Sequence, residues 1–273
     1  MKSVKLAHMA RPASAMSGRV LVAVGVLAMS AYSWSYPALA QNEGTGGSFE
    51  FFVPGEGQDI GGIYWLKSYS AAIQTVDGGV PPYTPEALAI YEEKRARIEA
   101  SAEIIEEDQA RGLCTPDGVP RVLQSPYPFE IVQTQGQIHF LYEINKIIRL
   151  VTMDEPLPDD DTLEIFPWYS GHSVGHWEGD TLVVETGGFK NYTFLDNLGA
   201  PHGYGLRVTE RYRKISDGNE LEVVVDIHDP GVFTEDWSAR FVYDLRPDLR
   251  MMDWNCGEVH RDISQVPGVV IPE

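Results

Sequence analysis

The sequence predicts a mainly β fold, an antiparallel up-and-down barrel that is preceded in the chain by one helix. Three observations support this prediction. Short runs of alternating apolar and polar residues fill the chain after Cys114, and turn-forming residues separate them. The chain before Cys114 carries one strong helical pattern. No repeat of 20–50 residues is visible, which argues against a solenoid or a propeller.

The helix is predicted over residues 83–112. Thr84 can cap its first turn, Pro85 suits the first helical position, and Glu86 complements the helix dipole. Gly112 can end it. Apolar residues recur at helical spacing, namely Leu88, Tyr91, Ile98, Ala102 and Ile105.

Nine runs after the helix are predicted as strands: FEIVQT, QIHFLYEI, KIIRLVTM, SVGHW, TLVVETGGF, LRVTERYRKI, LEVVVDIHD, SARFVYDL and MMDWNC. Turn signals such as QGQ, EGD and SDGN join neighbours into hairpins. A long meander tends to close, because closure removes exposed strand edges. A small barrel holds side chains or one small ligand. We therefore expect a calycin-like (lipocalin-like) barrel over 113–273, with a β-sandwich as the alternative.

Residues 1–40 are predicted to be a secretory signal peptide. A leader with basic residues and no acidic ones precedes the apolar run VLVAVGVLAMSA, and PALA supplies small residues before Gln41. The apolar run is shorter than the roughly 20 residues that a transmembrane helix needs. We expect cleavage after Ala40, a periplasmic product and an extended N-terminal arm over 41–82.

The chain is strongly acidic. The leader holds four of the 21 basic residues and none of the 40 acidic ones, which leaves 17 against 40, a formal charge of −23 after cleavage. Nucleic-acid binders neutralise phosphates with Lys and Arg, so this balance argues against a nucleic-acid partner. It also argues against binding to anionic lipid, and no membrane insertion is expected after cleavage.

The chain has two cysteines, Cys114 and Cys256. In an oxidising compartment the simplest expectation is a disulfide between them. Neither lies in a CxxC motif or beside a histidine that could activate it, which argues against a redox or nucleophilic role.

The segment GHSVGHWEGDTLVVET carries two histidines, His172 and His176, which raise the question of a metal site. On a strand, four residues span roughly 13 Å, whereas zinc–ligand bonds are about 2 Å long. Gly171 and Gly175 disfavour a helix. We therefore predict a hairpin that turns at EGD, with both histidines in or near a pocket. No metal or cofactor is expected, although a metal centre assembled from distant histidines stays an alternative.

The strand LRVTERYRKI places an acid among apolar residues. Alternation puts Leu206, Val208, Glu210 and Tyr212 on one face, which we expect to point inward. A carboxylate inside a barrel must be paired, or protonated with a raised pKa. Glu210 is therefore a candidate acid/base group, and Glu185 is a weaker one. The alternative is an ion pair with a buried arginine such as Arg149.

The loop GAPHGYG leads into this strand and places His202 and Tyr204 near a barrel mouth. A loop histidine can exchange protons near neutral pH, although a solvated turn histidine is an equal alternative. Aromatic residues gather in this part of the sequence and could line a cavity for an apolar or aromatic ligand. They are Trp168, Tyr169, Trp177, Phe189, Tyr192 and Phe194.

Five motifs in fixed order carry a family resemblance: CTPDGVPR, PYPFEIVQ, GHSVGHWEGDTLVVET, PHGYGLRVTERYR and the NC that ends at Cys256. Over about residues 80–262 the chain resembles a widespread family of exported Gram-negative proteins of unassigned function. The resemblance implies a fixed Cys114–Cys256 pair and marks His172, Glu185, His202 and Glu210 as positions of interest. The sequence departs from the family pattern at His176, where the family has arginine.

We expect a periplasmic, cofactor-independent acid/base enzyme, a lyase or isomerase, that acts on a small apolar or aromatic molecule inside the barrel. The predicted catalytic residues are Glu210, His202, His172 and Glu185. The predicted substrate-binding residues are Arg149, His176, Trp177, Tyr204 and Tyr212. A carrier of a small hydrophobic ligand is the alternative. An envelope interaction protein with a solid barrel is the third hypothesis.

Overall fold

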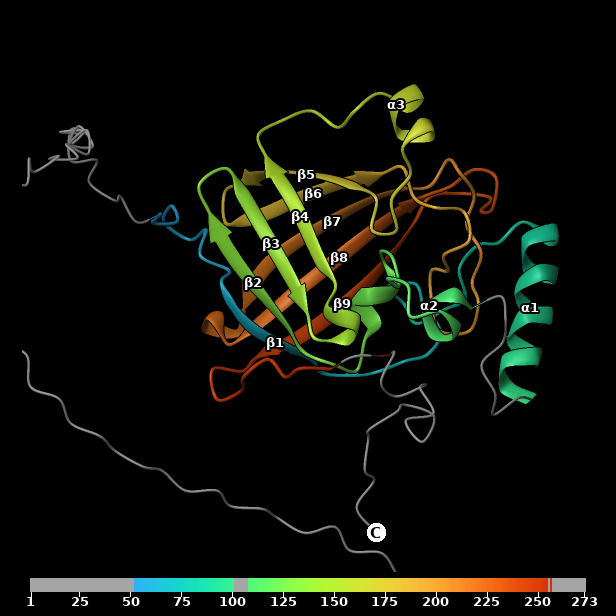
Figure 1. Cartoon of the computed structure of the whole chain (residues 1–273), viewed down its shortest axis with the longest axis horizontal. Coiled ribbons are helices and arrows are strands. Elements are labelled where there is room, and N and C mark those ends of the chain that lie inside the picture. Colours follow the sequence, from blue (N-terminus) through green and yellow to red (C-terminus); the bar gives the residue numbers. More distant parts are fainter. Residues whose placement is uncertain (1–51, 101–107, 255, 257–273) are drawn as a thin grey trace, which may run out of the picture. The chain divides into compact units, whose positions relative to one another are not determined.

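The computed structural model describes residues 52–100, 108–254 and 256, and these form a closed nine-stranded β-barrel with few helices (Figure 1). The strands are β1 (Gly62–Leu66), β2 (Phe129–Thr134), β3 (Gln137–Tyr142), β4 (Ile148–Met153), β5 (His172–Glu178), β6 (Thr181–Gly187), β7 (Arg207–Ile215), β8 (Glu220–His228) and β9 (Trp237–Leu245). The helices are α1 (Pro85–Ala100), α2 (Gln109–Gly112) and α3 (Asp160–Ile165), with short 3-10 turns η1 (Arg121–Gln124), η2 (Ile144–Lys146) and η3 (Ser216–Gly218). Within the described ranges, no helix has the length and apolar character needed to span a membrane.

Each strand pairs with the next one along the chain, and β1 pairs with β9 to close the barrel. The predicted barrel is therefore confirmed in place of the sandwich. The pairings between described strands are antiparallel except for β4 and β5, which run parallel with Val151 opposite Ser173. A parallel pair needs a long crossover, and residues 154–171, which include α3, supply it. The prediction of an entirely antiparallel meander is corrected at this point.

The strands at the two ends of the barrel also differ from the prediction. β1 lies within the segment expected to be an extended arm, where its residues pair with both β2 and β9. The run MMDWNC was predicted as a strand, but residues 251–254 have no regular secondary structure. GIYWL is thus the strand that closes the barrel. The predicted signal peptide lies outside the described residues.

One end of the barrel, which we call the capped end, is where β1, β3, β6 and β8 finish and β2, β4, β5, β7 and β9 begin. α1 lies there, beyond the strands (Figure 1). The Thr84 hydroxyl accepts a hydrogen bond from the Ala87 amide at 3.3 Å, as expected of an N-cap. Tyr91 donates to the buried Asp196 at 3.1 Å and so ties α1 to the loop between β6 and β7.

The barrel interior is packed with aromatic rings. Side chains alternate along each strand, so the inward set is buried while the outward set is more exposed. The ring centroids of Phe129 and Tyr243 lie 5.0 Å apart, as do those of Phe140 and Tyr212. The buried inward aromatic residues are Tyr64, Phe129, Phe140, Tyr142, Tyr212 and Tyr243. This part of the interior is a solid core.

The predicted disulfide between Cys114 and Cys256 is present, with an S–S distance of 2.06 Å across 142 residues of chain. A buried ion pair lies close to this disulfide in sequence. Arg121 donates two hydrogen bonds to Asp108 at 2.8 and 2.9 Å and lies 3.1 Å from Asp117. Arg121 Nε also donates to the Asn197 side-chain oxygen at 3.0 Å, which ties this segment to the loop between β6 and β7.

Candidate functional site

Glu210 lies on the inner face of β7 and is fully buried. Its carboxylate accepts hydrogen bonds from both terminal nitrogens of Arg149, with Nη1–Oε1 at 2.8 Å. The Tyr212 hydroxyl donates a third, at 2.6 Å to Oε1. Glu210 is thus paired with a buried arginine, which was one of the two alternatives predicted from the sequence.

Arg149 also uses its remaining donors inside the barrel. Its Nε donates to the Ser173 hydroxyl at 3.1 Å, and Nη2 donates to the Thr186 hydroxyl at 2.8 Å. Burial works against the charge on Arg149, but the Glu210 carboxylate outweighs burial and raises the Arg149 pKa. Burial, followed by the same carboxylate, raises the pKa of Tyr212. The five side chains form one neutral network that holds β4, β5, β6 and β7 together.

This network is separate from the cavities that could hold a substrate. Neither Glu210 nor Arg149 lines any of three cavities of 240 to 340 Å³ in the described part of the chain. A general acid or base must come within hydrogen-bond reach of the proton it transfers. The geometry therefore favours a structural role for Glu210, Arg149 and Tyr212.

His202 is buried in the loop between β6 and β7 and is held on both ring nitrogens. Nδ1 lies 2.9 Å from the Gly203 carbonyl oxygen, and Nε2 lies 2.7 Å from the Thr193 hydroxyl. Because a carbonyl oxygen only accepts, Nδ1 carries the proton. Burial lowers the pKa of His202, which favours the neutral ring. Its edge faces the Phe189 ring at a centroid distance of 6.2 Å.

His172 begins β5 and fastens the crossover to the barrel. Its Nε2 donates to the Phe166 carbonyl oxygen at 2.7 Å, and its ring stacks on Trp168 at 4.1 Å between centroids. Both partners belong to the segment that follows α3. The imidazole therefore has a clear positioning role at the capped end.

The other predicted site residues are spread over the barrel. Glu185 is exposed on the outer face of β6, away from Glu210 on the neighbouring strand. His176 is also turned outward, 3.4 Å from Glu178, whereas Trp177 packs against the core. The sequence pattern placed these residues on strands correctly but could not tell which face of the sheet was inside.

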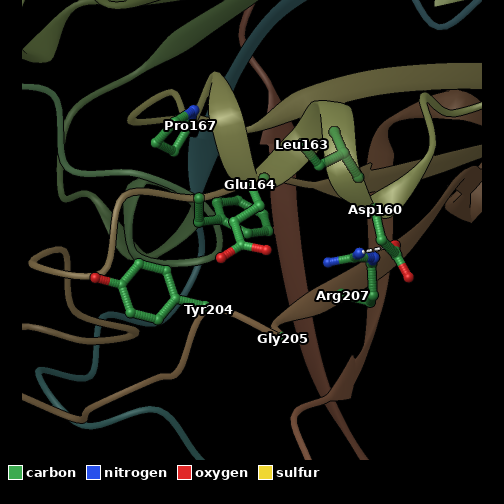
Figure 2. Close-up of a pocket in the computed structure, with 9 residues that line it drawn as sticks. Asp160, Leu163, Glu164, Pro167, Tyr204, Gly205 and Arg207 are labelled. Carbon is green, nitrogen blue, oxygen red and sulfur yellow. Dashed lines mark hydrogen bonds and ion pairs between the residues drawn. The ribbon is translucent and has the colours of Figure 1, made fainter.

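A cavity of about 240 Å³, here called the rim cavity, opens at the capped end between α3 and the loop that leads into β7 (Figure 2). Buried Leu163 and Phe189 form apolar parts of its wall, and the exposed Tyr204 ring stands at one side. The full lining is Asp160, Leu163, Glu164, Pro167, Gly188, Phe189, Tyr204, Gly205 and Arg207. Tyr204 is the member of this lining that was predicted to bind substrate.

The charged groups of the rim cavity differ in their pairing. Arg207 forms an ion pair with Asp160 and donates to the Leu206 carbonyl oxygen at 3.0 Å. The Glu164 carboxylate forms no hydrogen bond or ion pair with any residue of the described ranges, and Figure 2 shows it between Tyr204 and Arg207. A free carboxylate at a cavity can accept a hydrogen bond from a ligand.

The two histidines predicted to be catalytic, His172 and His202, lie next to residues that line the rim cavity. A Cβ atom added to Gly188 would lie 3.2 Å from the His172 ring, and the Phe189 ring contacts His202. Sequence reasoning missed Asp160, Glu164 and Arg207. A signal existed in PDDDTLE, because Asp159 caps α3 by accepting from the Thr162 amide at 2.8 Å.

No group of three or more His, Cys, Asp or Glu side chains suited to a metal ion occurs among the described residues. The expectation that neither metal nor cofactor is used stays a prediction. Comparison with protein-family models and with curated protein sequences finds no match for this chain.

Proposed function

We propose that this protein is a calycin-like, periplasmic binding protein that holds a small aromatic molecule in the rim cavity. The observation that carries the proposal is the free Glu164 carboxylate at a cavity walled by Phe189 and Tyr204. The basic and apolar leader supports the periplasmic location.

Exposed aromatic side chains around the rim cavity support an aromatic ligand. Phe166 is 62%, Trp168 57% and Tyr204 66% exposed, although rings of this size are usually largely buried. Clustered exposed apolar groups mark ligand or partner sites. Phe166 and Trp168 flank Pro167, which lines the cavity.

The size and charge of the rim cavity restrict the class of ligand that it can hold. At about 240 Å³ it lies just under the range of roughly 300–1,000 Å³ typical of ligand pockets, so it suits a single ring. Glu164 is free while Asp160 neutralises Arg207, which leaves the cavity acidic. We therefore propose a ligand with one aromatic ring and a hydrogen-bond donor or a positive charge.

The proposal is tested first by native mass spectrometry of the protein purified from the periplasm, which identifies a co-purifying ligand. Tyramine and its uncharged analogue 4-ethylphenol then serve as probes in protein NMR. We expect tyramine to shift the amide signals around Phe189 and Tyr204 and to bind more tightly than 4-ethylphenol. Glu164→Gln should remove that difference, and Tyr204→Ala should weaken both probes. Absence of shifts at these amides with either probe would refute the proposal.

A second candidate function is the acid/base enzyme predicted from the sequence, with its chemistry moved to the rim cavity. The unpaired Glu164 carboxylate favours it, because a general base needs a free lone pair that faces the substrate. In this version Glu164 takes a proton from the bound molecule in a lyase or isomerase reaction. Glu164→Gln should then lower turnover of the co-purified molecule by about 10²-fold or more while binding persists. Unchanged turnover would rule this candidate out.

A further inference from the structure

A second cavity of about 320 Å³, here called the polar cleft, lies between the segment that follows β1, the turn η1 and the strand β9. Its lining consists of Leu66, Ser68, Tyr69, Ser70, Ala72, Gln74, Thr75, Val76, Gly78, Gln124, Arg240 and Phe241. It shares no residue with the rim cavity. The proposed function makes no use of it.

The polar cleft is rich in uncharged hydrogen-bonding groups. Hydroxyls come from serine, threonine and tyrosine, and amides come from Gln74 and Gln124. Its charged side chain is Arg240, whose Nε donates to Glu222 at 2.7 Å. Glu222 is shared between Arg240 and Arg213, which lies 3.0 Å from its other oxygen, while the rest of the lining offers uncharged donors and acceptors. Such a surface suits a neutral ligand with many hydroxyl groups.

Gln124 also lines the polar cleft, although its side chain is almost fully buried. The side chain is 1% exposed, and its Nε2 donates to the Leu195 carbonyl oxygen at 2.9 Å. Its Oε1 is buried and accepts no hydrogen bond from any residue within the described ranges. Buried polar atoms are normally satisfied by protein, water or ligand. Because this oxygen has almost no accessible surface, it lies behind the lining of the polar cleft and is not itself a contact for a ligand.

The apolar part of the lining matches the remaining surface of such a ligand. Leu66 and Phe241 are partly buried and pack against the core, while the Tyr69 ring stands at the edge and is 52% exposed. Asn197 donates to the Tyr69 hydroxyl at 3.5 Å, which restrains the ring. A sugar ring has hydroxyls at its rim and apolar C–H faces that pack against an aromatic ring. The Ser70 and Thr75 hydroxyls already have protein partners, and each keeps further hydrogen-bonding capacity that a ligand hydroxyl can use.

We propose that the polar cleft binds a neutral sugar of one or two rings. Tyr69 packs against a face of the sugar, and the serine and threonine hydroxyls of the lining form hydrogen bonds with its hydroxyl groups. The volume of about 320 Å³ lies at the lower end of the usual range for ligand sites, roughly 300–1,000 Å³. The site is separate from the rim cavity, so it does not depend on the proposed function.

The test is NMR titration of the ¹⁵N-labelled protein with glucose, N-acetylglucosamine and maltose. We expect at least one of these sugars to shift the amide signals of residues 66–78 and of Phe241. Tyr69→Ala should weaken that binding by about tenfold, the upper end for loss of one aromatic contact. Tyr204→Ala removes an exposed tyrosine of the rim cavity instead, and should leave sugar binding unchanged.

Gln124→Met tests the buried amide while it preserves the length of the side chain. Its melting temperature is measured beside its affinity, because loss of the Leu195 hydrogen bond can also reduce stability. Tyr69 is exposed, so Tyr69→Ala keeps the test decisive even where Gln124→Met fails to fold. The proposal is overturned where none of the three sugars shifts these signals, or where Tyr69→Ala leaves the shifts and the affinity unchanged.

Discussion

Glu210 in the barrel interior and two residues at the capped end, Glu164 and Gln124, differ in how their polar groups are paired. In the interior, Glu210 and Arg149 satisfy each other with help from neighbouring hydroxyls, and neither the rim cavity nor the polar cleft reaches them. At the capped end, the Glu164 carboxylate and the Gln124 Oε1 lack partners among the described residues, and each of the two residues lines a cavity. A complete network resists change, whereas an incomplete one beside an opening leaves room for a ligand.

Glu210 and Glu164 are the same type of residue, but the first carboxylate is buried and paired and the second is unpaired at a cavity. Burial alone first suggested a functional role for Glu210, because desolvation can shift a carboxyl group toward the pKa of a useful acid. Arg149 donates hydrogen bonds to both oxygens of the Glu210 carboxylate, so burial is no longer an argument for a functional role of Glu210. Glu164 looks ordinary in sequence, yet it keeps its lone pairs free at a cavity. The free acceptor, rather than the buried one, is the better guide to a site in this barrel.

The largest effect is expected from the disulfide that joins the segment before β2 to the segment after β9. Cys114→Ser combined with Cys256→Ser opens a loop of 142 residues. A chain-entropy model gives a loss of about 5 kcal/mol in the free energy of unfolding. Urea unfolding monitored by tryptophan fluorescence measures it. A loss under about 1 kcal/mol would mean that the unfolded chain is compact without the disulfide.

The interior network should give the next largest loss. Glu210→Gln leaves the Arg149 charge buried without a counter-charge, which typically costs about 3–5 kcal/mol. Urea unfolding measures the loss. The matched control is the double variant Arg149→Met with Glu210→Gln, which removes both charges and should recover part of the stability. A normal melting temperature for Glu210→Gln would make this residue a functional candidate again.

Most of the fold could be predicted from the sequence because strand periodicity is a local property. The runs at Phe129, Gln137 and Arg207 were placed as strands, and closure followed from their number. β1 was not predicted from the sequence, because GIYWL is a short run inside a glycine-rich segment. The parallel pairing of β4 and β5 was not predicted either. The sequence does not show that the connection over 154–171 returns to the end of the barrel at which β4 begins.

The site was harder to predict because it depends on contacts between distant segments. Alternation placed Glu210 inside the barrel, and Arg149 was named as its potential partner, but the choice between pairing and catalysis needed three dimensions. The rim cavity joins α3 to the loop before β7, which comes much later in the chain. Tyr204 was found through its glycine-rich loop, whereas Glu164 sits in a short helix that no hydrophobic pattern marks.

A smaller effect on stability is expected from His202, which lies at the capped end and forms hydrogen bonds with both ring nitrogens. Burial lowers its pKa below the ordinary value of 6.5, so the unfolded chain binds a proton more readily than the folded one. Stability from this group is therefore present above pH 6.5 and is lost as the pH falls below it. The slope reaches at most about 1.4 kcal/mol per pH unit for one proton.

Urea unfolding at pH 7.5, 6.5 and 5.5 measures that slope in the wild type and in His202→Gln. We expect the variant to be less stable at pH 7.5, since it loses contacts to Thr193 and Gly203, but to lose less on acidification. His176→Gln, on the outer face of β5, is the matched control. Equal slopes for wild type and His202→Gln would show that His202 can take up a proton without unfolding.

The smallest change in stability is expected for Glu164→Gln, the counterpart of Glu210→Gln. Glu164 is exposed and forms no hydrogen bond or ion pair with the described residues, so the free energy of unfolding should change by no more than about 0.5 kcal/mol. The same substitution should still lower tyramine affinity, because the ligand loses its charged acceptor. Measured together, the two glutamine variants separate stability from binding. If Glu164→Gln unfolds the protein as readily as Glu210→Gln does, then the carboxylate at the rim is structural and the distinction between the interior and the capped end fails.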